Sequence, residues 1–190
     1  SFFNMIKQPD GVPQAISQNT CMFKMAKENG FQTYFYSAQA QDQLAQLKSY
    51  LCTNFIDDYF DGTSLTKDKG TPTLDENLIS KIDDIDFSKP SFITLHQRAS
   101  HSPFYDTYPK EFEIYNKDNI QDTTLNQNLI NYLNSVRYTD YIIENIIKKL
   151  NNSLINSNID GILIDNYFNS KIDNPLKKID YLANSLSEHY

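Results

Sequence analysis

Segments with apolar residues at helical spacing alternate along this chain with short apolar or aromatic runs, which predicts helices that alternate with strands. Residues 14–29 have helical spacing, and Gly30 is placed to end that helix. The aromatic run at residues 31–36 predicts a strand, and residues 42–51 predict a second helix. Residues 57–72 are polar and predict a loop.

The second half of the chain repeats this alternation. A short helix is predicted at residues 75–82, a strand at 92–95 and the longest helix at 125–150. Further on, residues 162–164 predict a buried strand and 176–186 a closing helix. The apolar stripe expected to bury the long helix consists of Leu129, Leu133, Val136, Ile143, Ile147 and Leu150.

Helices that alternate with strands indicate an α/β fold, with a mostly parallel sheet and helices on both of its faces. The 190 residues suit one domain with a sizeable core, so residues 1–190 are interpreted as a single α/β domain. Three predicted strands are few for a complete fold of this kind. We therefore expect part of the sheet to lie outside this chain.

Composition and charge narrow the range of partners. The chain is 39% apolar and 13% aromatic, which is typical of a globular protein. Its formal net charge of -7 argues against nucleic acid or an anionic membrane surface, because both require clustered Lys and Arg. Neither a membrane-spanning run nor a signal peptide is evident. Since the chain starts at Ser1 without a methionine, we expect it to be part of a longer protein.

Cys21 and Cys52 are the two cysteines of the chain. Two separate buried thiols are the favoured interpretation, and one disulfide, stabilising the fold by about 3 to 4 kcal/mol, is the alternative. Neither cysteine has the neighbours expected of a metal site or an activated nucleophile.

The strand predicted at residues 92–95 leads into a loop that contains His101. Open α/β sheets bind ligands at the carboxyl ends of their strands. An imidazole there can ligate a metal, bind a phosphate oxygen or transfer a proton, although a surface histidine without a role is the alternative. His96 lies within the apolar strand, which favours a hydrogen-bonded core histidine over a ligand.

The loop reads Ser100-His101-Ser102-Pro103, follows Leu95-His96-Gln97 and precedes Tyr108-Pro109. These motifs resemble the sulfatase-like phosphoethanolamine transferases of the alkaline phosphatase superfamily, which modify bacterial surface lipids. The resemblance is clearest over residues 1–150 and implies an alkaline-phosphatase/sulfatase-like fold. It also implies that His101, with Ser100 beside it, contacts the phosphoryl substrate or a second zinc ion.

Two further segments take part in the resemblance. Tyr36-Ser37-Ala38-Gln39 resembles a segment that lines the substrate pocket of the family, so Ser37 and Gln39 are candidate pocket residues. A plain turn after a strand is the alternative for this short motif. Tyr132 to Asp140 resembles a helical motif of the family in which Leu133 replaces an aspartate.

Asp140 interrupts the apolar stripe of the long helix, so a buried hydrogen-bond partner is expected for its carboxylate. Its expected role, supported by neighbouring Tyr138, is to orient the His101 loop. An exposed helix aspartate is the alternative.

The resemblance also shows which catalytic parts are missing. The family uses a threonine nucleophile activated by zinc, which is held by an upstream acid, the threonine and a late Asp-His pair. Ser1 to Met5 resembles the segment just after that nucleophile, so threonine and acid are expected before Ser1. Asp165 matches the late aspartate and is a candidate zinc ligand, but Asn166 replaces the histidine and ligates zinc poorly. Either this segment is a degenerate counterpart of the late motif, or the resemblance ends near Leu150.

The resemblance implies part of the extracytoplasmic catalytic domain of a zinc-dependent phosphoethanolamine transferase. Its donor would be a phospholipid and its acceptor lipid A or a glycan. The longer protein would have transmembrane helices ahead of Ser1 and act at the periplasmic face of the inner membrane. The main alternative is a degenerate, non-catalytic domain that binds a ligand or partner, which Asn166 and Leu133 favour. A hydrolytic sulfatase or phosphatase is a weaker third hypothesis.

Overall fold

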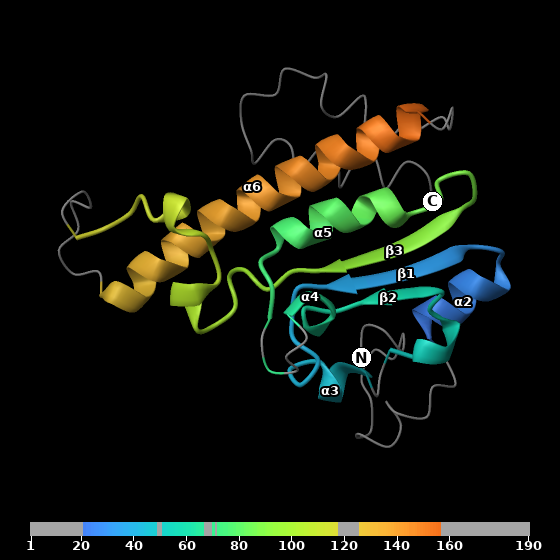
Figure 1. Ribbon diagram of the computed structural model, residues 1–190, viewed down its shortest axis with the longest axis horizontal. Helices are drawn as coiled ribbons and strands as arrows, with labels where there is room; N and C mark the ends of the chain where they lie inside the picture. Colours follow the sequence, from blue (N-terminus) through green and yellow to red (C-terminus); the bar gives the residue numbers. More distant parts are fainter. Residues whose placement is uncertain (1–20, 49–50, 67–69, 71, 118–125, 157–190) are drawn as a thin grey trace, which may run out of the picture.

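The computed structural model describes residues 21–48, 51–66, 70, 72–117 and 126–156, and a parallel sheet lies at its centre. Its strands have the order β2-β1-β3, where β1 is Gln32–Ser37, β2 is Asp58–Phe60 and β3 is Ser91–His96 (Figure 1). The predicted α/β class and the strands at 31–36 and 92–95 are therefore confirmed.

The loop predicted at residues 57–72 is wrong in part. It contains β2 and the short helix α4, Thr63–Thr66. β2 pairs Asp58, Tyr59 and Phe60 with β1, and only Phe60 of these is fully buried. A three-residue strand of this kind depends on pairing with a distant segment, and its own apolar pattern is too short to reveal it.

Helices cover both faces of the sheet, as predicted (Figure 1). Side chains alternate along β1, so Tyr34 and Tyr36 point to one face and Phe35 to the other. The Tyr34 face packs against α5 (Glu76–Lys81), η2 (Ile82–Asp84) and the long helix α6 (Gln127–Asn156). The Phe35 face packs against α2 (Met22–Glu28) and the segment that contains α3 (Ala45–Lys48) and η1 (Thr53–Phe55).

The helix boundaries differ in detail from those predicted. The helices expected at 75–82 and 125–150 correspond to α5 and α6. Gly30, with φ of +84°, follows α2 as expected, but residues 14–20 lie outside the described residues. Of the helix predicted at 42–51, the described residues contain α3. The predicted strand at 162–164, the helix at 176–186 and the Asp165 motif also lie outside the described part. None of the described helices is both long and apolar enough to span a bilayer.

The predicted apolar stripe of α6 is wrong for half of its six residues, because the most buried face of the helix is a different one. Leu133, Ile147 and Leu150 are half-buried, and Leu150 packs against the core on the Tyr34 face. Leu129, Val136 and Ile143 are exposed. The fully buried residues are Ile130, Asn134, Ser135, Tyr138 and Ile142. Asn134 is buried because its side chain accepts from the backbone N–H of Tyr115 at 2.9 Å and donates to its carbonyl at 3.0 Å. A polar side chain that is satisfied in this way can enter the core, which a hydrophobicity pattern cannot anticipate.

Cys21 and Cys52 form a disulfide, so the favoured interpretation as separate thiols is wrong. The disulfide joins the start of α2 to the residue before η1, and both cysteines are buried beside Phe23 and Leu51. The two cysteines are 31 positions apart in the sequence, so only the tertiary structure brings them together.

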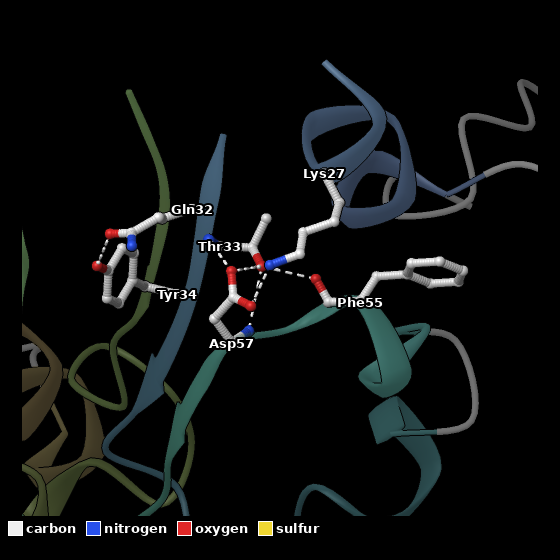
Figure 2. Close-up of polar contacts among 6 residues, drawn as sticks. All are labelled: Lys27, Gln32, Thr33, Tyr34, Phe55 and Asp57. Carbon is white, nitrogen blue, oxygen red and sulfur yellow. Dashed lines mark hydrogen bonds and ion pairs between the residues drawn. The ribbon is translucent and has the colours of Figure 1, made fainter. Parts of the chain in front are cut away.

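At the amino end of the sheet, polar groups pair with one another around Asp57 (Figure 2). The Thr33 backbone N–H donates to Asp57 Oδ2 at 3.0 Å, and Asp57 N–H donates to the Thr33 carbonyl at 2.9 Å. Thr33 Oγ1 donates to the Phe55 carbonyl at 2.6 Å, and Lys27 of α2 forms an ion pair with Asp57. This end of the sheet is closed by contacts within the chain.

Candidate functional site

A cavity of about 380 Å³ lies at the carboxyl end of the sheet, where open α/β sheets bind ligands. β1 and β3 end there, at Ser37 and His96, and these two residues are register partners. The residues that line the cavity are Gln39, Gln43, Leu44, Leu47, His96, Arg98, His101, Ser102 and Pro103. The structure therefore brings two of the predicted pocket residues, Gln39 and His101, to one cavity.

Ser37 lies behind the cavity wall and supports His96. Its hydroxyl is buried, lies 2.9 Å from His96 Nδ1 and accepts the backbone N–H of Gln39 at 3.1 Å. Burial, and to a lesser degree the nearby charge of His101, lowers the pKa of His96 from 6.5. His96 is thus a hydrogen-bonded histidine as predicted, and it also lines the cavity, which sequence reasoning did not foresee.

The backbone around Gln39 is held by a close approach of three segments. Gly62 N–H donates to the Gln39 carbonyl and Thr73 N–H to the Ala38 carbonyl, both at 2.9 Å. A Cβ at Gly62 would lie 2.8 Å from the Thr73 nitrogen and 3.0 Å from the Ala38 oxygen. Because any side chain at position 62 would separate these segments, glycine allows the contact that places Gln39 at the cavity.

The turn out of β3 is held by Asp75, a buried carboxylate that the sequence analysis missed. Its two oxygens accept the backbone N–H groups of Arg98 at 2.7 Å and Ala99 at 2.9 Å. Burial raises the pKa of Asp75, although these two hydrogen bonds and the charge of Arg98 oppose the shift. An aspartate just before a helix resembles an ordinary cap in sequence, so nothing there indicates a contact 23 residues away.

His101 lies on the exposed rim of the cavity, on the loop that follows β3. Its Nδ1 is 2.6 Å from the Ser102 carbonyl oxygen. A carbonyl only accepts, so Nδ1 is the donor and carries hydrogen. In the neutral ring this leaves Nε2 with its lone pair, which is suited to accept a hydrogen bond or to ligate a metal.

Ser100 and the long helix hold this loop from the opposite side. Ser100 has a φ of +63°, and its hydroxyl lies 2.9 Å from Thr139 Oγ1. Since Thr139 donates to the Ser135 carbonyl at 3.0 Å, Ser100 donates to Thr139. Ser100 contacts α6 and is not among the residues that line the cavity, so a direct contact with substrate stays a prediction.

Asp140 is exposed, so the expectation of a buried partner for it is wrong. Its neighbour Thr139 makes the contact to the loop that was expected of Asp140, because Thr139 is half-buried and its hydroxyl reaches Ser100. Tyr138 is fully buried, and its hydroxyl accepts the backbone N–H of Glu76 at 3.3 Å. A supporting role for either residue in function stays a prediction.

Arg98 is a cavity residue that the sequence analysis also missed. It is only 8% exposed, and its guanidinium contacts Asp106 twice, at the carbonyl and at the carboxylate, both at 2.8 Å. Asp106 belongs to η3, Phe104–Asp106, at the far end of the His101 loop. Arg98 therefore connects the two ends of this loop and is also one of the residues that line the cavity.

The described residues do not make a complete zinc site. His96 and His101 offer two imidazoles at the cavity, whereas a catalytic zinc site takes at least three protein ligands. Within the described ranges, no group of three or more His, Cys, Asp and Glu is arranged to hold a metal ion. Asp165 lies outside them. We therefore assign no step of a reaction to zinc in this part of the chain.

The fold and the position of this site define a class of protein. A parallel α/β sheet with its cavity at the carboxyl end agrees with a family comparison, in which the model described as Sulfatase matches residues 2–159. The chain belongs to the sulfatase family.

Two solved structures share the fold. Both are of the C-terminal periplasmic domain of EcEptC from Escherichia coli, and one is a complex with Zn. The TM-scores are 0.54 and 0.53, with 18% identity over 69% and 68% of this chain. This chain spans 38% of the length of either structure. EptC is a phosphoethanolamine transferase. No characterised protein matches the chain in a search of curated sequences.

These comparisons confirm the sulfatase-like α/β fold that the loop motif predicted. The resemblance was predicted to be clearest over residues 1–150, and the family model matches the chain as far as residue 159. The low identity to the solved structures supports the fold alone, and the roles of the individual cavity residues stay predictions.

Proposed function

We propose that this chain is part of the catalytic domain of a sulfatase-family phosphoethanolamine transferase. The observation that carries the proposal is the cavity at the carboxyl end of the sheet. It combines His96, His101 and Arg98 with the amides of Gln39 and Gln43, and none of the described residues that line it has a carboxylate. In a chain with a net charge of -7, such a cavity favours an anion, and phosphoryl oxygens accept the hydrogen bonds that these side chains can donate.

In this proposal the described residues bind and orient the head group. Gln39 and Arg98 donate to phosphoryl oxygens, and His101 Nε2 holds or accepts a proton at the rim. The nucleophile, the acidic ligand and the zinc they would hold belong to the longer protein. Its donor would be a phospholipid, its acceptor lipid A or a glycan, and its place the periplasmic face of the inner membrane. Residues 1–190 would form one domain with the rest of the sheet.

His101→Ala in the longer protein tests the proposal. A residue that transfers a proton or stabilises the transferring group contributes about 100-fold or more, so transfer should fall by about that factor. The measurement follows labelled phosphoethanolamine from a phospholipid donor to lipid A in membranes. Unchanged transfer would remove His101 from the reaction.

Tyr105→Ala is the matched control, because Tyr105 lies on the same loop, is 68% exposed and does not line the cavity. It should retain transfer. Equal losses in both variants would mean that the loop, and not the imidazole, was damaged.

A non-catalytic, ligand-binding domain is the second candidate. The replacement of the family's late histidine by Asn166 and of its helical aspartate by Leu133 favours it. The two candidates differ in their products: an enzyme transfers the head group, whereas a binding domain retains phosphoethanolamine without consuming it. A hydrolase, the third hypothesis, would release the head group without an acceptor.

A further inference from the structure

Arg98 contributes the one permanent positive charge among the described residues that line the cavity. The other polar groups there are two imidazoles, two amides and a hydroxyl. The guanidinium has five N–H donors, and the contacts with Asp106 use two of them. Within the described residues, the contacts with Asp106 leave the other three N–H donors for a ligand, and a planar guanidinium suits two oxygens of one tetrahedral anion.

The contacts of Arg98 also hold the guanidinium in place before any ligand binds. Its backbone N–H is held by buried Asp75, and its side chain by Asp106. A long side chain that is already ordered loses less conformational entropy on binding, so more of the interaction energy contributes to affinity.

We propose that Arg98 determines the anion specificity of this cavity by binding a tetrahedral oxyanion, of a phosphate or sulfate ester, directly and without a metal. This inference rests on the proposed function, because it concerns the same cavity. It adds a residue that the family motif did not indicate. The proposed contact with the anion is made by Arg98, which lies in the described part of the chain.

The test is a titration of the metal-free chain, kept in a chelator, with inorganic phosphate, followed by the guanidinium Nε–H signals in NMR. The sequence contains two arginines, Arg98 and Arg137, so two such signals are expected. Arg137 lies over the Phe112 ring, does not line the cavity, and serves as the internal control. We expect the Arg98 signal to move in a saturable way while the Arg137 signal stays. Binding without movement of the Arg98 signal, or no binding, overturns the proposal.

Three variants separate binding from loop support. Arg98→Gln should weaken phosphate binding by about 10- to 100-fold, the usual effect of a lost charge-assisted hydrogen bond. Arg98→Lys should recover only part of it, because an ammonium lacks the planar fork. Asp106→Asn removes the competing negative charge, while the backbone carbonyl and the amide oxygen at position 106 still hold the guanidinium, so this variant should bind phosphate as well as the unchanged chain or better. If Asp106→Asn loses as much affinity as Arg98→Gln, Arg98 only supports the loop and the proposal fails.

The same titration with inorganic sulfate and with phosphoethanolamine distinguishes the sources of the anion. Tighter binding of phosphoethanolamine than of either inorganic ion supports a head-group site at Arg98. Equal binding of all three supports a site for the free anion. Because no turnover is measured, a failure of transfer in the longer protein leaves this result unaffected, and a failure here leaves the transfer assay unaffected.

Discussion

The two ends of the sheet differ in how their charged side chains are paired. At the amino end, Asp57 accepts from Thr33 and pairs with Lys27, so its carboxylate has partners within the chain (Figure 2). At the carboxyl end, Arg98 and His101 make internal contacts with only some of their polar atoms. The amino end therefore stabilises the fold, whereas the carboxyl end holds groups ready for a ligand.

Polar side chains behind the cavity keep the carboxyl end of the sheet ordered, although the cavity is open. Asp75, Ser37 and Thr139 each hold a residue of the cavity or its loop from behind. Their hydrogen bonds keep His96, Arg98 and the loop in position without occupying the cavity. Such supporting contacts are what a site needs if it is to be ordered before ligand binds.

The largest effect is expected from the disulfide, which belongs to the same core cluster as Leu44. Replacing both Cys21 and Cys52 by serine should lower the free energy of unfolding by about 3 to 4 kcal/mol, since the disulfide closes 31 positions of sequence. Denaturant unfolding measures the change. Because Leu44 lines the cavity, phosphate binding should weaken as well. Equal stability with and without a reducing agent would contradict a structural disulfide.

Asp57→Ala should have a smaller effect, confined to the amino end. Its loss leaves Thr33 without an acceptor for its backbone N–H, which costs about 1 to 3 kcal/mol. Phosphate binding at the cavity should stay unchanged, in contrast to the disulfide variant. Asp57→Asn is the matched control, because the amide oxygen can still accept from Thr33, and it should cost less. A change in phosphate affinity in either variant would show that the two ends are coupled.

The smallest expected effect is a difference in pH dependence between the two ends. The pKa of His96 is lowered from 6.5, so the unfolded chain binds its proton first and the contribution of His96 to stability is lost as the pH falls below 6.5. Burial opposes ionisation of Asp57, but hydrogen bonds from Lys27 and Thr33 outweigh it and lower its pKa below 3.8. Its contribution is therefore retained until the pH falls below 3.8.

Thermal unfolding between about pH 7 and about pH 5 measures this difference. The midpoint of the unchanged chain should fall further over this range than that of His96→Gln, which cannot titrate. Asp57→Asn should show the same fall as the unchanged chain. If His96→Gln also shows the full fall, another group is responsible for it.

Much of the fold was predictable because its signals are local. The aromatic run at β1, the apolar run at β3 and Gly30 after α2 each have their pattern within a few residues. The loop motif around His101 indicated the family and the end of the sheet at which the cavity lies. Gln39 was found by the same route, since its segment leaves the neighbouring strand.

The features that were missed depend on contacts between distant segments. β2 is too short to show a pattern of its own, and α6 was assigned the wrong buried face because Asn134 is satisfied by Tyr115. Arg98 and Asp75 resemble ordinary surface residues in sequence, although both are buried and joined by a hydrogen bond.

The sequence by itself determined the class of fold, the order of the main elements and the loop that carries His101. Local spacing and a short motif are sufficient for these features, because they depend on neighbouring residues. Only the tertiary structure decided the disulfide, the buried face of α6 and the place of Arg98 in the cavity. Each of these features depends on a partner far away in the chain. A polar side chain such as Asn134 or Arg98 can be buried only where its hydrogen-bond partners are present.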